Sequence, residues 1–320
     1  MKRFKKILFV VSGAFDATSP AFKRAQTLAE SNFAELCLLK VLPPLSTQAF
    51  EGALGMTLPE IEDRMQQEEA DKLAHAVSEL TSTCQITSTV KLGKNYLEAI
   101  RLVLHEHYDL VIKVAENPGW LDRLFGSDDM HLLRKCPCPV WLMKEDETQV
   151  YKQILAAVDF DRSNQEFGEH ELNQMIVELA SSFAIAEFAS LHVLNVYDVP
   201  SAGFISLWVN KPELVEQQMQ ENEYQLKKSA LRSLLDWLKQ KMGTETYRFL
   251  APSMQVIQGH AAQKLPEIAN QEAFDLVVMG TVGRSGIAGL IMGNTAESVL
   301  SQLNCSVLVV KPAGFVSPVA

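Results

Sequence analysis

Three glycines in one stretch of the chain have a spacing that suits the binding of an anion. Gly280, Gly283 and Gly293 lie between an apolar run that ends at Met279 and a segment of helical pattern that opens at Asn294. Glycine permits positive φ and lets backbone N–H groups approach a phosphate without an intervening side chain. The positive end of the following helix would add to that attraction. The stretch therefore predicts a phosphate site, although an ordinary tight strand-to-helix turn gives the same spacing.

Composition bounds the class of protein to which such a site belongs. The chain has 320 residues, 47% of them hydrophobic and 21% charged, with a net charge of -10. Length predicts about two domains. The negative charge argues against a nonspecific nucleic-acid binder and against a basic membrane-surface protein. The apolar run at residues 7–11 is too short for a signal peptide, and no run approaches the roughly 18 apolar residues of a spanning helix, so we expect a cytoplasmic protein.

The cysteines do not predict a disulfide framework or a zinc site. They are odd in number and lack paired metal-ligand spacing. The five are Cys37, Cys84, Cys136, Cys138 and Cys305. Cys136-Pro-Cys138 is the only close pair, and an apolar run follows it. We interpret this pair as the start of a strand.

An internal repeat divides the chain into two copies of one domain. Residues 6–12 match residues 153–159, and residues 93–112 match residues 259–278. A polar segment without hydrophobic pattern at 145–149 suits a short linker. We therefore predict a first domain over residues 1–147 and a second over residues 150–314.

Strand and helix patterns alternate within each copy. In the second copy the predicted strands are 154–158, 189–196, 253–258, 276–279 and 307–310. The predicted helices are 172–183, 213–242, 263–272 and 297–303. Such alternation predicts an α/β fold with a parallel sheet covered on both faces by helices. Ligands of such sheets bind beyond the carboxyl ends of the strands, where the strand order reverses.

Several motifs together resemble those of a known family. A first strand ends in Asp159, the second contains Leu191-His-Val193, the glycine stretch follows, and the copy closes with Cys305-Ser-Val-Leu-Val-Val-Lys-Pro312. With these residues the whole chain resembles a tandem universal stress protein, in which two universal stress domains are fused. The resemblance implies two Rossmann-like, flavodoxin-type domains, each with a five-stranded and mostly parallel sheet.

The resemblance also implies a nucleotide site. Nucleotide-binding members of the family have glycine, two residues, glycine, nine residues, glycine, and then serine or threonine. Gly280, Gly283 and Gly293 fit this pattern, whereas Asn294 replaces the hydroxyl residue. Either Thr295, one position on, or the Asn294 amide would then contact the phosphates. The implied ligand is ATP or another adenine nucleotide, accompanied by Mg²⁺.

Two further residues receive roles from the same resemblance. Asp159 is expected to meet the adenine or ribose side, and the backbone of Val193 to pair with the base edge. The alternatives are that Asp159 serves as a turn or helix cap and that Val193 is a core residue. Arg284, the single cation of the glycine stretch, either pairs with a phosphate or is solvated. His260 lies near the expected mouth of the site.

The first copy has lost this pattern. Ser12 stands where the second copy has Asp159, and residues 113–118 contain none of the glycines. Asp128 and Asp129 at the following helix start are expected to cap that helix and repel a phosphate. We therefore expect binding, if any, in the second copy only.

Three classes of function stay open at this stage. No catalytic constellation is evident, because no phosphate-loop lysine follows the glycines and no nucleophile elbow is present. We therefore rank non-enzymatic nucleotide binding above slow ATP hydrolysis. The apolar segments 49–56 and 202–209 would suit a hydrophobic ligand, a protein partner or a homodimer contact, or would simply pack as lids.

Overall fold

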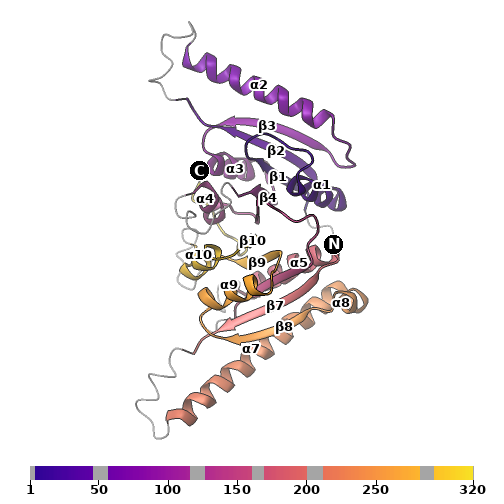
Figure 1. Cartoon of the computed structure of the whole chain (residues 1–320). Helices are drawn as coiled ribbons and strands as arrows, with labels where there is room; N and C mark the ends of the chain where they lie inside the picture. Colours follow the sequence, from indigo (N-terminus) through magenta and orange to yellow (C-terminus); the bar gives the residue numbers. More distant parts are fainter. Residues whose placement is uncertain are drawn as a thin grey trace. The chain divides into compact units, whose positions relative to one another are not determined.

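This computed structural model describes residues 4–45, 57–115, 127–160, 169–199, 212–281 and 292–319. They form two compact units, the first built mainly from Met1–Gln149 and the second mainly from residues between 150 and 314 (Figure 1). None of the helices within these described ranges is long and apolar enough to cross a membrane.

The first unit alternates strands and helices. Its strands are β1 (Lys6–Val11), β2 (Glu35–Leu42), β3 (Ile86–Leu92), β4 (Leu110–Val114) and β5 (Val140–Met143). Its helices are α1 (Pro20–Asn32), α2 (Leu58–Ser78), α3 (Asn95–Glu106) and α4 (Asp128–Lys135). The strands lie in the order β3-β2-β1-β4-β5, and each neighbouring pair in this unit is parallel.

The second unit repeats this arrangement. Its strands are β6 (Gln153–Val158), β7 (Ser190–Tyr197), β8 (Ser253–Gln258), β9 (Leu276–Gly280) and β10 (Ser306–Val310). Its helices are α5 (Glu169–Glu187), α7 (Pro212–Met242), α8 (Thr244–Leu250), α9 (Ala261–Gln271) and α10 (Asn294–Leu300). The order is β8-β7-β6-β9-β10, again parallel within the unit. The predicted α/β fold with a parallel sheet is confirmed.

Both faces of each sheet are covered, which explains the apolar strands. Every residue of β5 and β10 is buried, and β1 and β9 are buried except at one end. Right-handed crossovers that step one way along the sheet place their helices on one face, and those that step back use the other. Accordingly α5 contacts α7, whereas α9 contacts α10. The strand order reverses at β6, between β7 and β9, so the site is expected there.

Helix α8 was not predicted from the sequence. The pattern indicated one long helix up to Met242, and the structure ends α7 at that residue. Gly243 then has φ 87°, a conformation that glycine adopts readily, and the chain starts a new short helix at Thr244. The connection therefore contains a second helix because glycine permits the sharp turn.

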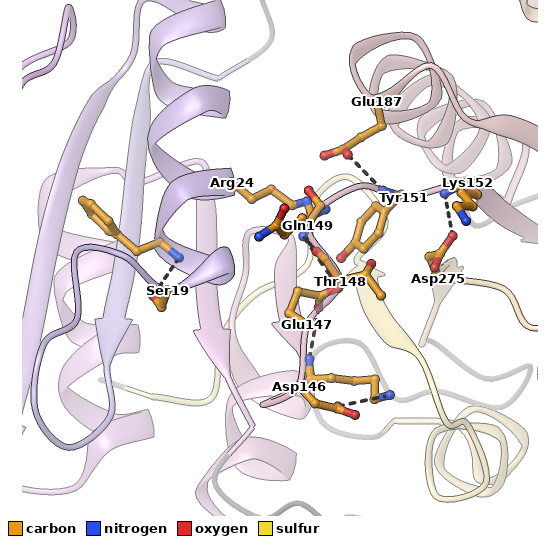
Figure 2. A network of polar contacts seen from close by, with 12 residues as sticks. Ser19, Arg24, Asp146, Glu147, Thr148, Gln149, Tyr151, Lys152, Glu187 and Asp275 are labelled. Atoms are coloured by element: carbon orange, nitrogen blue, oxygen red, sulfur yellow. Dashed lines mark hydrogen bonds and ion pairs between the residues drawn. The ribbon is translucent and has the colours of Figure 1, made fainter.

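The segment between the two units is held by side chains at both of its ends (Figure 2). Buried Arg24 of α1 donates to the carbonyls of Thr148 (3.0 Å) and Gln149 (3.1 Å), and its guanidinium lies 3.6 Å from the Glu147 carboxylate. Just beyond it, the Tyr151 N–H donates to Glu187 of α5 at 3.1 Å. The predicted polar linker is therefore tied to structured elements, although its sequence has no regular pattern.

Candidate functional site

Two chain segments leave the second sheet side by side at the point where the strand order reverses. Ala157 of β6 pairs with Met279 of β9. Asp159 and Thr281 each follow two residues later, so they lie at the same level of the carboxyl edge. Asp159 is exposed there. A carboxylate and the start of the glycine stretch are thus neighbours at the place where α/β sheets bind ligands.

The two described ends of the glycine stretch are joined to each other. The Gly293 N–H donates to the carbonyl of Thr281 at 2.9 Å. From the end of β10, the Lys311 ammonium donates to the Thr281 hydroxyl at 2.5 Å. Lys311 is only 4% exposed, so it is a buried cation beneath the stretch. Gly283 and Arg284 lie outside the described residues.

Gly280 has a packing reason to be glycine. A Cβ atom built on it would lie 2.8 Å from Cδ2 of Leu172 and 3.7 Å from Cδ1 of Ile176, both on α5. Such a contact is too short for carbon atoms, so glycine lets α5 approach β9 closely. Packing against α5 therefore gives a reason for glycine here that does not involve a ligand. The argument for a phosphate therefore depends more on Gly283 and Gly293 than on Gly280.

Residues beyond Gly293 are accessible. Gly293 is the N-cap of α10, and because it has no side chain it supplies no side-chain cap. Asn294 and Thr295, the first two residues of the helix, are exposed. The hydroxyl of Thr295 and the amide of Asn294 are therefore both within reach of a ligand at this edge.

Two buried asparagines hold the main chain that leads to Asp159. Asn195 of β7 donates through Nδ2 to the Val158 carbonyl at 2.9 Å. Asn173 of α5 donates to the Asp159 carbonyl at 2.5 Å and accepts from the Asp159 N–H at 3.2 Å. Buried polar groups that bond the backbone in this way fix its direction. The Asp159 main chain is therefore positioned from two elements.

A third side chain extends this support. Lys227 of α7, which is 8% exposed, donates to the Phe160 carbonyl. Its ammonium also lies 3.2 Å from the Glu223 carboxylate. The carbonyls of residues 158, 159 and 160 thus each accept from a different element: β7, α5 and α7. Sequence reasoning missed all three donors, although a polar Asn195 inside an otherwise apolar strand was an available signal.

Val193 does not lie at the edge of the sheet. It pairs with Ala156 on one side and Met254 on the other, and it is buried. Because Val158 pairs with Asn195, the residue level with Asp159 is Val196. The structure therefore brings Asp159, Thr281 and Gly293 to one edge, but places Val193 about three residues, roughly 10 Å, further inside the strand.

The side chain of His260 lies at the same edge and contacts an acidic residue of the second unit. His260 is the N-cap residue of α9, and its Nδ1 lies 2.7 Å from the Asp198 carboxylate, which follows β7. Both side chains are at least partly exposed. The imidazole is thus positioned by Asp198 at the carboxyl ends of β7 and β8.

The matching edge of the first unit is filled by an ion pair. Lys113 of β4 is 1% exposed, and its ammonium lies 2.5 Å from the carboxylate of Asp129, the second residue of α4. The helix cap is the Ser127 hydroxyl, which accepts from the Met130 N–H at 3.2 Å. The expectation that Asp129 caps the helix is thus replaced by a pairing with Lys113, which the sequence did not reveal.

The described residues at this edge of the second unit combine acidic groups with a buried cation. This edge offers the exposed carboxylates of Asp159 and Asp198, the hydrogen bond that joins the two described ends of the glycine stretch, and the buried ammonium group of Lys311 next to Thr281. Within the described ranges, no group of three His, Cys, Asp or Glu side chains could hold a metal ion. A metal at this edge would need oxygen ligands from a bound molecule, as Mg²⁺ commonly has.

Comparison with known proteins agrees with the repeat. The sequence model of the Universal stress protein family matches twice, over residues 3–144 and 151–311. A universal stress protein E homolog of Haemophilus influenzae is 30% identical over 97% of this chain and 98% of its own length. Universal stress protein E of Escherichia coli K12 is 31% identical over 69% of this chain and 66% of its length.

Solved structures show the same fold at lower identity. A functionally unknown protein from Pseudomonas aeruginosa PAO1 has a TM-score of 0.63 at 24% identity, covering 97% of this chain and 94% of its own. A universal stress protein from Archaeoglobus fulgidus has a TM-score of 0.57 at 15% identity, with 97% coverage of both chains. With two family matches that span nearly its whole length, the chain belongs to the universal stress protein family.

Proposed function

We propose that this chain is a non-enzymatic, cytoplasmic stress-response protein that binds an adenine nucleotide such as ATP in its second domain, residues 150–314. One observation carries the proposal. The hydrogen bond from Gly293 to Thr281 closes the glycine stretch beside exposed Asp159, at the point where the strand order reverses. A closed glycine stretch and a neighbouring carboxylate match the two ends of a nucleotide, because the stretch suits phosphates and the carboxylate suits ribose hydroxyls.

Each residue has a distinct role in this proposal. Asp159 accepts hydrogen bonds from the ribose or adenine side, and its position is supported by the bonds to residues 158–160. Gly283, Gly293, Asn294 and Thr295 surround the phosphates. Arg284 would add a cation there. The base edge would meet the main chain near Val196, which is level with Asp159, rather than at Val193.

Buried charge favours the phosphate side of the proposed site. The Lys311 ammonium lies directly behind Thr281, and a cation in a low-dielectric interior attracts an anion more strongly than one in water. When Mg²⁺ accompanies ATP, the phosphates and water would supply most of its ligands.

The test uses the first copy as a template. Asp159→Ser installs the residue that the first copy has at Ser12. Losing a hydrogen bond to a charged group should weaken ATP binding by about 10- to 100-fold. Binding is measured by the saturable rise of the melting temperature with ATP, because a ligand of the folded state stabilises it by mass action.

Two controls make the outcome clear. Ser12→Ala in the first unit should leave ATP affinity unchanged, and the melting temperature of ligand-free Asp159→Ser should stay close to that of the parent. The proposal fails if ATP produces no shift in the parent, or if Asp159→Ser binds ATP as the parent does. Phosphate release above the buffer blank would instead indicate an enzyme.

A further inference from the structure

The turn between α4 and β5 brings two thiols together. Cys136 is the C-cap of α4, and its N–H donates to the Leu132 carbonyl at 2.9 Å. Cys138 follows after one proline, and the sulfur atoms of the two cysteines are 3.6 Å apart. Cys136 is fully buried and Cys138 partly exposed. Both thiols therefore lie in a largely buried turn, with part of the Cys138 residue at the surface.

The prolines in this turn fix the geometry of the pair. Pro137 separates the cysteines and Pro139 follows them, and each proline holds its own φ near −65°. The hydrogen-bonded C-cap holds Cys136 at the end of the helix. Because little conformational freedom remains to be lost, a ligand that takes both sulfurs would bind at low entropic cost.

The distance between the sulfurs suits a shared ligand. Two thiolates bound at about 2.3 Å to one centre are roughly 3.4 to 3.8 Å apart, the lower value for a pyramidal centre and the higher for a tetrahedral one. The observed 3.6 Å lies within that range. Thiolate ligands select soft ions. Within the described part of the chain no cluster of three metal-ligating side chains is present, so a ligand here must be satisfied by two protein sulfurs.

We propose that Cys136 and Cys138 form a two-thiol chelating site for a thiophilic metalloid, of the class of trivalent arsenic compounds. An organic arsenic(III) oxide needs only two sulfurs to complete its three bonds. Two S–H bonds and the bonds from arsenic to oxygen break, and two As–S bonds form. The oxygen leaves as water with both thiol protons, and no atom is oxidised or reduced. This site is independent of the proposed nucleotide site.

Because the Cys138 thiol stays protonated at neutral pH, binding of an arsenical and alkylation are expected to differ. The hydrogen bond with Cys136 raises the pKa of the Cys138 thiol well above its usual range, and burial raises it further. Since alkylation requires the thiolate, reaction with iodoacetamide should be slow at neutral pH. An arsenic(III) oxide takes up both protons as water is released, so the raised pKa does not prevent its binding.

The second unit offers a natural control. At the corresponding turn, residues 303–305 are Leu303-Asn304-Cys305, so only one thiol is present. Cys136→Leu copies this turn into the first unit. Because Cys136 is buried and leucine is larger, Cys138→Ser at the partly exposed position provides a second variant with less risk to folding.

The experiment treats the folded full chain with one equivalent of phenylarsine oxide and measures intact mass. We expect one phenylarsenic group per chain, removed by 2,3-dimercaptopropanol but not by the same concentration of 2-mercaptoethanol. Cys136→Leu and Cys138→Ser should each lose the adduct, whereas Cys305→Ser and Cys84→Ser should keep it. The proposal is overturned if the parent takes up no arsenical, or if Cys138→Ser retains the adduct.

Discussion

The carboxyl edges of the two sheets carry polar side chains at matching positions, and those side chains have different partners. Lys40 pairs with Val11 in the first unit as Asn195 pairs with Val158 in the second. The Lys40 ammonium lies 2.5 Å from the Glu69 carboxylate of α2, a side chain on the covering helix. Asn195 instead donates to the main chain of Val158. The polar side chain therefore pairs with another side chain in the first unit, and with a backbone carbonyl in the second.

A second pair of positions shows the same contrast. Lys113 pairs with Val10, and Met279 pairs with Ala157, at equivalent places two residues before Ser12 and Asp159. Lys113 carries its charge into a buried ion pair, whereas Met279 is an ordinary core residue. In the first unit, the charge at the carboxyl ends of the strands is thus neutralised by an ion pair within the unit. In the second unit, buried side chains donate to the carbonyls at the end of β6 and leave the Asp159 side chain exposed. An exposed carboxylate on a fixed main chain suits a binding site.

The largest expected effect comes from removing the buried cation of the first unit. Lys113→Met introduces the residue type of Met279 and leaves the Asp129 carboxylate buried without its ammonium. Because an uncompensated buried charge is costly, we expect a loss of about 3 to 5 kcal/mol in the stability of the first unit. Faster hydrogen exchange of the β4 amides, with little change in β9, would measure it.

A double variant shows whether the charge pair is the cause. Lys113→Met combined with Asp129→Ala removes both charges, so it should cost less than Lys113→Met alone. Equal or greater loss in the double variant would mean that Lys113 stabilises the unit by packing, and the contrast between the edges would lose its electrostatic basis.

The next test concerns the packing of the second unit. Gly280→Ala places a Cβ atom 2.8 Å from Cδ2 of Leu172, the end of a flexible side chain that must turn away, so overpacking should cost about 1 kcal/mol, the low end of its usual range. Leu172→Ala in the same chain should cost less than the sum of the two single changes, because it makes room for the new methyl group. Urea unfolding of the three variants measures this coupling. A Gly280→Ala chain of parent stability that no longer binds ATP would contradict the packing explanation.

The fold was predictable because its signals are local and occur twice. Apolar runs of strand length alternate with helical patterns, and residues 6–12 repeat as 153–159, so the parallel sheet followed from the order of elements. Helix α8 was not predicted because its start depends on the positive φ of Gly243 rather than on any change of hydrophobic period. Local turn geometry of this kind has no periodic signature.

Residues of the candidate site could be named from the sequence only where residue type or the family resemblance pointed to them. Gly293 stood out because a glycine before a helix suits an anion, and Asp159 stood out through the resemblance to the family. Asn173 and Lys227 did not, because they act on backbone atoms far away in sequence. The role of Val193 came from the resemblance to the family; a sequence does not reveal register, and in the structure Val196 is the residue of β7 that is level with Asp159.

The smallest expected effect is a pH dependence that belongs to the first unit. Hydrogen bonds from Lys40 and then from Lys72 lower the pKa of Glu69 from 4.5 to about 2. A carboxylate with a lowered folded-state pKa stabilises the protein above its unfolded pKa, and this stabilisation is lost as the pH falls through the folded value. The contribution should therefore be complete above about pH 4.5 and disappear towards pH 2.

Glu69→Gln isolates this contribution. The pair with Lys40 is partly solvated, so the variant should lose only about 0.5 to 1 kcal/mol at pH 7. The difference in urea midpoint between parent and variant should shrink steadily from pH 4.5 downwards, while other pH effects cancel. Asn195→Ala, which removes an uncharged group at the position that matches Lys40, should give a difference without this pH dependence. If the Glu69→Gln difference were the same at pH 3 and pH 7, the Lys40 to Glu69 contact would not be the electrostatic counterpart of the backbone contact made by Asn195.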